Sequence, residues 1–190
     1  MDGAFEVGFN KLIATQLDLG THKFGGTNFS GNSIALHGIL HSSETLSFGA
    51  FVGRDSLESA DREFAGLEVG FEADSFDIEG YYLNKIDNQE SFDVLGVSGN
   101  YHLSDTFALT GSLESGDIGS SFSMKRYALG MRYMVSTGVT LTADIGASEA
   151  ESFGVRGSET FVGVGAEFTF GAARGATFGK RSLFEVIPGL

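Results

Sequence analysis

The feature that most constrains this chain is a two-residue period in hydrophobicity. In the segment 127–135 every second side chain is apolar, and the positions between them are mostly small or charged. Because neighbouring side chains of a β-strand point to opposite faces, this period predicts a strand with one apolar face. The pattern recurs, and the sequence predicts ten strands. They lie near 4–13, 34–40, 46–52, 65–73, 76–83, 92–103, 107–113, 127–135, 139–147 and 160–170.

The connections between these strands alternate in length. The short ones have the size of hairpin turns, at 41–44, 74–75, 104–106 and 136–138. The others are longer and more polar, at 14–31, 54–62, 84–90, 115–124 and 148–159. In an antiparallel sheet, all long loops then fall at one end, and the short turns and both termini fall at the other.

This layout is typical of a bacterial outer-membrane β-barrel, whose tilted strands need about 9–11 residues to cross the membrane. The sequence therefore predicts an all-β, closed antiparallel transmembrane barrel over 1–170, with about ten strands and a range of eight to twelve. Pairing of strand 4–13 with strand 160–170 would close it. The alternative is a soluble sandwich or lipocalin-like barrel, which also alternates. The many glycines, 28 in 190 residues, favour a crowded narrow lumen over a soluble protein's outer surface.

Charge and composition exclude several classes of function. The net charge of -13 argues against a nucleic-acid surface, and the absence of cysteine excludes disulfides and thiolate metal sites. No cofactor or metal is predicted. The sequence contains no run of 18 apolar residues, and its first residues lack the features of a signal peptide. We therefore expect either a cytosolic protein or a mature chain with an added Met1.

Three segments carry a resemblance to a known family: the turn and strand at 101–111, the strand at 126–133 and the strand at 160–170, which ends in the aromatic Phe170. Over 4–170 the chain resembles the porin-like outer-membrane β-barrel proteins of Gram-negative bacteria, in the style of the alphaproteobacterial porins. The resemblance implies an outer-membrane location, contact with outer-membrane lipid, and a narrow channel for ions or small solutes.

With the apolar face outward, several ionisable side chains point into the lumen. Such groups are expected to pair, because an unpaired charge in a narrow space of low dielectric is costly. They form either a network that holds the barrel together or a lining that selects cations. We predict that Arg126 and Arg132 reach carboxylates on neighbouring strands. The predicted lumen residues are His37, Glu68, Glu72, Arg126, Arg132, Asp144 and Glu167.

Residues 171–190 differ in composition from the barrel and are predicted to be a C-terminal periplasmic tail. The tail combines three cations with apolar residues, and Arg174, Lys180, Arg181 and Phe184 are its candidate partner-binding residues. Three outcomes are open: disorder, folding back into the acidic lumen as a plug, or docking on a periplasmic or membrane protein. The last supports an alternative function, a structural or interaction barrel with a closed lumen whose C-terminal tail or loops bind a partner complex.

An enzyme is not predicted. The segment 41–44 has a histidine-x-serine spacing that resembles the outer-membrane lipid A deacylases. It falls on a predicted short turn, however, where serine and glutamate are ordinary residues.

Overall fold

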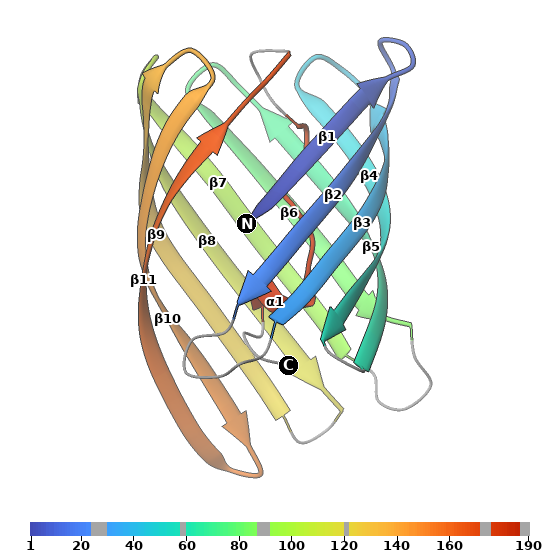
Figure 1. The fold of residues 1–190 in the computed structure, drawn as a ribbon, viewed down its shortest axis with the longest axis vertical. Coiled ribbons are helices and arrows are strands. Elements are labelled where there is room, and N and C mark those ends of the chain that lie inside the picture. Colours follow the sequence, from blue (N-terminus) through green and yellow to red (C-terminus); the bar gives the residue numbers. More distant parts are fainter. Residues whose placement is uncertain (24–29, 58–59, 87–91, 120–121, 172–175, 187–190) are drawn as a thin grey trace.

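The computed structural model describes residues 1–190 except 24–29, 58–59, 87–91, 120–121, 172–175 and 187–190. Eleven antiparallel strands follow one another in chain order in one sheet, which curls into the barrel shape of Figure 1. The elements are β1 (Asp2–Gly8), β2 (Ile13–Lys23), β3 (Ser30–His41), β4 (Leu46–Leu57), β5 (Ala60–Glu72), β6 (Phe76–Lys85), β7 (Phe92–Ser104), β8 (Phe107–Ile118), β9 (Phe122–Ser136), β10 (Val139–Ser152), β11 (Val155–Phe168) and the short helix α1 (Leu183–Val186).

The predicted short turns are confirmed, and they share one end of the barrel, which we call the turn end. The predicted long loops are wrong in most of their length, because the strands continue into them. In the segment 148–159, β10 and β11 stay paired up to Ser152 and Val155. The two residues between them, Phe153 and Gly154, both have positive φ, as a tight type I′ hairpin requires.

The eleven strands lie within the predicted range of eight to twelve but exceed the expected ten by one, because much of the segment 14–31, predicted to be a loop, is a strand. Its first part forms β2, in which Ile13, Thr15, Leu17 and Leu19 alternate with Ala14, Gln16, Asp18 and Gly20. The polar inward face of this strand makes it look like a loop in the sequence.

With eleven strands, an odd number, β1 and β11 run in the same direction. Among the described residues β1 pairs with β2 and β11 pairs with β10, so the predicted closing pair between the first and last strands is not present. The structure is therefore a curled sheet with two edges, and the prediction of a closed ring of strands is not confirmed.

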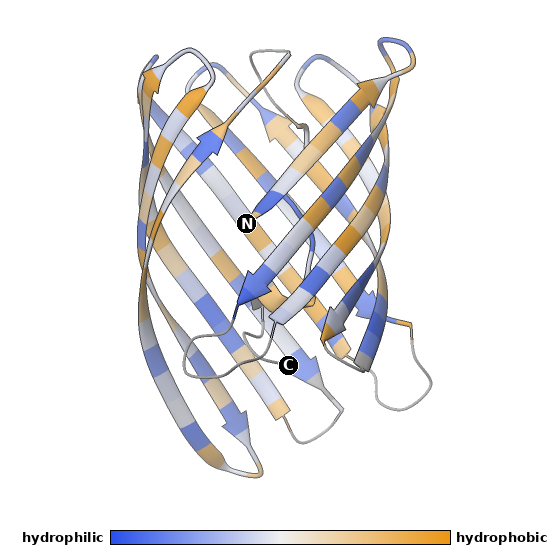
Figure 2. Cartoon of the chain, viewed as in Figure 1, coloured by the Kyte–Doolittle hydropathy of each residue, from blue (hydrophilic) through white to orange (hydrophobic). Residues whose placement is uncertain are grey.

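The apolar face of the sheet points outward, as predicted. Leu129, Met131, Val164 and Phe168 expose 49–85% of their surface, and Figure 2 shows the apolar and polar positions alternating along the strands. A soluble sandwich would bury this face, so that alternative does not describe the chain. Among the described residues, no helix is long and apolar enough to cross a membrane.

The core lies inside the curled sheet, where the described part of the tail, 176–186, packs. The tail enters from the turn end and runs along the interior to α1, as Figure 1 shows. Leu183 is fully buried in an interior cluster. The other buried members of that cluster are Ala35, Phe51, Phe64, Tyr81, Leu83, Phe92, Val94 and Met124. The structure thus differs from the prediction of a separate periplasmic tail. Of the three outcomes considered for it, the described residues adopt the plug.

Two glycines let the tail approach the sheet this closely. A Cβ on Gly31 would lie 2.7 Å from Cε2 of Phe184, and a Cβ on Gly49 would lie 2.7 Å from Cε2 of Phe178. Both distances are shorter than any van der Waals contact, so side chains at these positions would push the tail rings away.

Candidate functional site

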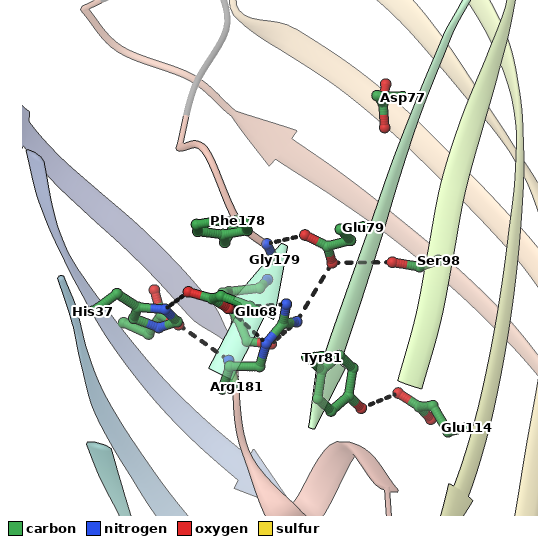
Figure 3. A network of polar contacts seen from close by, with 12 residues as sticks. His37, Glu68, Asp77, Glu79, Tyr81, Ser98, Glu114, Phe178, Gly179 and Arg181 are labelled. Carbon is green, nitrogen blue, oxygen red and sulfur yellow. Dashed lines mark hydrogen bonds and ion pairs between the residues drawn. The ribbon is translucent and has the colours of Figure 1, made fainter. Parts of the chain in front are cut away.

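The centre of the interior is built around Arg181 of the tail (Figure 3). Its Nε and Nη2 atoms each lie 3.1 Å from Oε2 of Glu68 on β5, and its Nη1 lies 3.4 Å from Oε1 of Glu79 on β6. Its Cζ lies 4.1 Å from the ring centroid of Tyr81, also on β6. The Arg181 side chain is only 4% exposed. A nearly buried guanidinium is thus held between two carboxylates and an aromatic face.

A buried histidine organises the carboxylates of this site. Nδ1 of His37 lies 2.7 Å from Oε1 of Glu68, and Nε2 lies 2.8 Å from Oδ2 of Asp18. The His37 side chain is fully buried. Ionised carboxylates only accept hydrogen bonds, so both ring nitrogens donate only when the ring is an imidazolium. His37 and Arg181 together then balance the charge of Glu68 and Asp18.

The polar side chains of the sheet also satisfy the backbone of the tail. The N–H groups of Thr177, Phe178, Gly179 and Arg181 donate to side chains of the sheet. The acceptors are Glu6 Oε2 at 2.7 Å, Gln16 Oε1 at 3.2 Å, Glu79 Oε2 at 2.9 Å and Asp18 Oδ2 at 3.1 Å. Since a buried extended segment has no intrasegment partners, these acceptors allow it to lie inside the barrel.

The start of α1 is capped from the sheet. Oδ2 of Asp55 accepts hydrogen bonds from the Ser182 hydroxyl at 3.0 Å and from the Leu183 N–H at 2.6 Å. The Ser182 hydroxyl oxygen accepts the N–H of Phe184 at 3.1 Å. Asp55 is buried, so this contact anchors the end of the tail in the interior.

The opposite part of the interior, on β8–β11, holds simpler ion pairs. Arg132 donates to Glu167 at 2.9 Å, which confirms one predicted pairing. Arg126 lies 3.4 Å from Glu114, a carboxylate that the prediction did not include, and its Cζ lies 4.4 Å from the ring centroid of Phe161. Arg132 and Glu167 keep contact with solvent, being 36% and 43% exposed, whereas Arg126 and Glu114 are 24% and 13% exposed.

The other predicted residues lie in separate places. Asp144 packs against the backbone at Gly163, where a Cβ would lie 2.4 Å from its Oδ1. Glu72 is exposed at the turn end of β5, opposite Asp77 in the register. The structure brings together His37, Glu68 and Arg181. Phe184 lies elsewhere in the interior, where its ring centroid is 5.3 Å from that of His22.

Of the remaining tail candidates, Lys180 forms an ion pair with Asp2 at the start of β1. Arg174 lies outside the described residues. Arg181 and Phe184 are buried against the sheet of their own chain. The partner-binding role predicted for them stays a prediction.

Sequence reasoning did not name five residues of the interior, three of which fall in the predicted loops 14–31 and 54–62. These are Gln16, Asp18, Asp55, Tyr81 and Glu114. The alternation that continues through 13–23 is the signal that would have found the first two.

The histidine-x-serine segment is a turn in the structure. Nδ1 of His41 lies 2.9 Å from the hydroxyl of Ser47. The hydroxyl oxygen of Ser43 accepts the N–H of Thr45 at 3.2 Å and that of Leu46 at 3.0 Å, which shapes the β3–β4 hairpin. The serine therefore serves the local turn.

Neither a family model nor a curated relative matches the sequence. Solved structures do match. The KdgM porin is 11% identical, with 88% of this chain and 90% of that one covered at a TM-score of 0.66, and KdgM in complex with disordered oligogalacturonate gives 0.67. The NanC porin is 7% identical, with coverages of 89% and 98% at 0.58. The outer-membrane channel DcaP of Acinetobacter baumannii is 14% identical, with coverages of 89% and 62% at 0.57.

At these identities the likeness establishes the fold. The chain has the antiparallel β-barrel fold of the outer-membrane porins. The narrower expectation of an alphaproteobacterial style has no support in these matches.

Proposed function

We propose that this chain is an outer-membrane β-barrel protein that forms a narrow, porin-like passage for ions or small solutes, with part of its lumen filled by its own C-terminal tail. Two observations support the membrane location. The fold is that of outer-membrane porins, and the large apolar side chains of successive strands point outward around the sheet. Lipid is the solvent that such a surface fits.

The main observation in favour of a passage is the solvent exposure of the inward side chains along β8–β11. There the paired side chains of Arg132 and Glu167 remain 36% and 43% exposed, whereas His37 and Glu68 beside the tail are fully buried. Polar, partly hydrated side chains on one side of the interior are what a water-filled path requires.

The charge of the interior favours cations over anions. The inward carboxylates include Asp18, Asp55, Glu68, Glu79, Glu114, Asp144 and Glu167, and they outnumber the inward cations Arg126, Arg132, Arg181 and His37. KdgM has been seen with oligogalacturonate, an anion, so its solute is a poor guide for this chain. A ring of acidic side chains attracts cations and repels anions.

The test is single-channel recording in planar lipid bilayers with folded protein purified in detergent. We expect small conductance steps and a reversal potential that shows cation selectivity under a KCl gradient. Protein unfolded by heat from the same preparation is the control and should give no steps. Folded protein without steps, both as the natural chain and with a loosened tail (Leu183→Ala), would contradict the proposal and favour a closed-lumen barrel.

A further inference from the structure

The surroundings of Arg181 are a built site that the chain's own side chain occupies. Glu68 and Glu79 approach different nitrogens of the guanidinium, and Tyr81 covers one of its faces. These three side chains belong to the strands β5 and β6, and Arg181 belongs to the tail. The site is therefore formed by the barrel, and the tail supplies its occupant.

The partners of the occupant are themselves held in place. Oε1 of Glu68 is bound by His37 at 2.7 Å, and Oε1 of Glu79 accepts the Ser98 hydroxyl at 3.0 Å. The Tyr81 hydroxyl donates to Glu114 at 2.9 Å, and its ring lies so close to Gly96 that a Cβ there would be 2.1 Å from it. A geometry fixed by neighbouring side chains favours one ligand shape over another.

That shape is planar and has several donors. A guanidinium can donate along two directions in its plane while an aromatic ring covers its face, and an ammonium of the same charge cannot match this arrangement. Without Arg181, the carboxylates Asp18, Glu68 and Glu79 would still have His37 as a cation among the described residues, because His37 contacts both Glu68 and Asp18. The remaining negative charge would then be buried and would favour another cation.

We propose that this cluster is a guanidinium-binding subsite of the passage, that Arg181 occupies it as an intramolecular ligand, and that guanidinium solutes such as arginine and arginyl peptides are the class it binds when the tail is displaced. This inference rests on the proposed function, because it treats the guanidinium compounds as solutes of the proposed passage. The tail is thus both plug and competitor, because the solute must take the place of Arg181.

The first test uses the full chain with Arg181→Ala and the probe ethylguanidinium, with ethylammonium as the control of equal charge. We expect calorimetry to show binding of ethylguanidinium at least tenfold tighter than that of ethylammonium, and no binding by the natural chain. Adding Glu68→Gln to Arg181→Ala should abolish the preference. Equal binding of the two probes, or none, would overturn the proposal.

A second test keeps Arg181 in place and loosens the tail with Leu183→Ala. Ethylguanidinium should then compete with Arg181 and raise several-fold the rate at which chymotrypsin cleaves after Phe178, and ethylammonium should not. An unchanged rate would count against the site. Bilayer recordings on the same samples separate the two proposals. Conductance without selective binding overturns only the subsite, and selective binding without conductance overturns only the channel.

Discussion

The interior of the barrel has two unlike sides. Along β2–β6 the tail fills the space, and Gln16, His37 and Asp55 are at most 1% exposed. Along β9–β11 the strands show the same alternation, yet inward side chains such as Arg132 and Glu167 stay about two-fifths exposed. Both sides contain ion pairs, but the pairs differ in burial. The loss of one partner is therefore expected to cost more stability on the buried side than on the exposed side. The presence of a second layer, here the tail, turns a lumen lining into a core.

The largest expected effect comes from a histidine of the tail-filled side. His37→Leu removes the shared partner of Asp18 and Glu68 and leaves both carboxylates buried, so we expect the free energy of unfolding to fall by about 3–5 kcal/mol. The measurement is heat or urea unfolding in detergent, followed by gel mobility or by the near-UV circular dichroism of the tyrosines, since the chain has no tryptophan.

The matched control is His102→Leu, which removes a comparable contact from an exposed site. His102 lies 3.0 Å from Asp77, and the two side chains are 44% and 36% exposed. A loss of about 0–1 kcal/mol is expected there. If both substitutions cost the same, burial by the tail does not strengthen the contacts of this side, and the comparison fails.

A second prediction concerns the apolar anchor of the tail. Leu183→Ala leaves a cavity in the interior cluster and should weaken docking of the tail by about 2–5 kcal/mol. Chymotrypsin cleavage after Phe178 should accelerate, and single-channel conductance should rise, while the barrel stays folded. Val155→Ala, at an exposed position beside the β10–β11 turn, is the control and should change neither. Failure of the whole barrel to fold would show that the tail belongs to its folding core.

A smaller effect is expected from the glycine under Phe184. Gly31→Ala places a methyl group 2.7 Å from the ring and should cost about 1–3 kcal/mol through displacement of the end of the tail. Gly157→Ala on β11 meets nothing within 4 Å and should change stability by less than about 0.5 kcal/mol. Equal effects of the two substitutions in thermal unfolding would mean that the ring does not need the space at Gly31.

The smallest effect on stability, but a clear effect on transport, is expected from Arg132→Leu. The pair with Glu167 is partly exposed, so its loss should cost about 0–1 kcal/mol. Removing a cation from the open side should make the passage more cation-selective, visible as a larger reversal potential in a salt gradient. An unchanged potential would place the conducting path away from β9–β11.

Much of the fold was predictable because its causes are local. The alternation in 127–135 and 139–147 follows from the geometry of a strand, and the turn positions follow from residues with turn preference. The strand at 13–23 was not predicted, because its inward side carries Gln16 and Asp18, which read as a polar loop. Their role depends on contacts with Phe178 and Arg181, more than 160 positions away.

The sequence by itself determined that the chain is an antiparallel all-β structure whose strands have one apolar face, because a period of two is the geometry of a strand. The structure shows that this apolar face points outward. Only the tertiary structure decided that the strands number eleven and that the tail lies within them. It also decided that Arg181 meets Glu68, Glu79 and Tyr81. The physical reason is that such contacts depend on where distant segments meet inside the barrel, which local hydrophobic patterning does not encode.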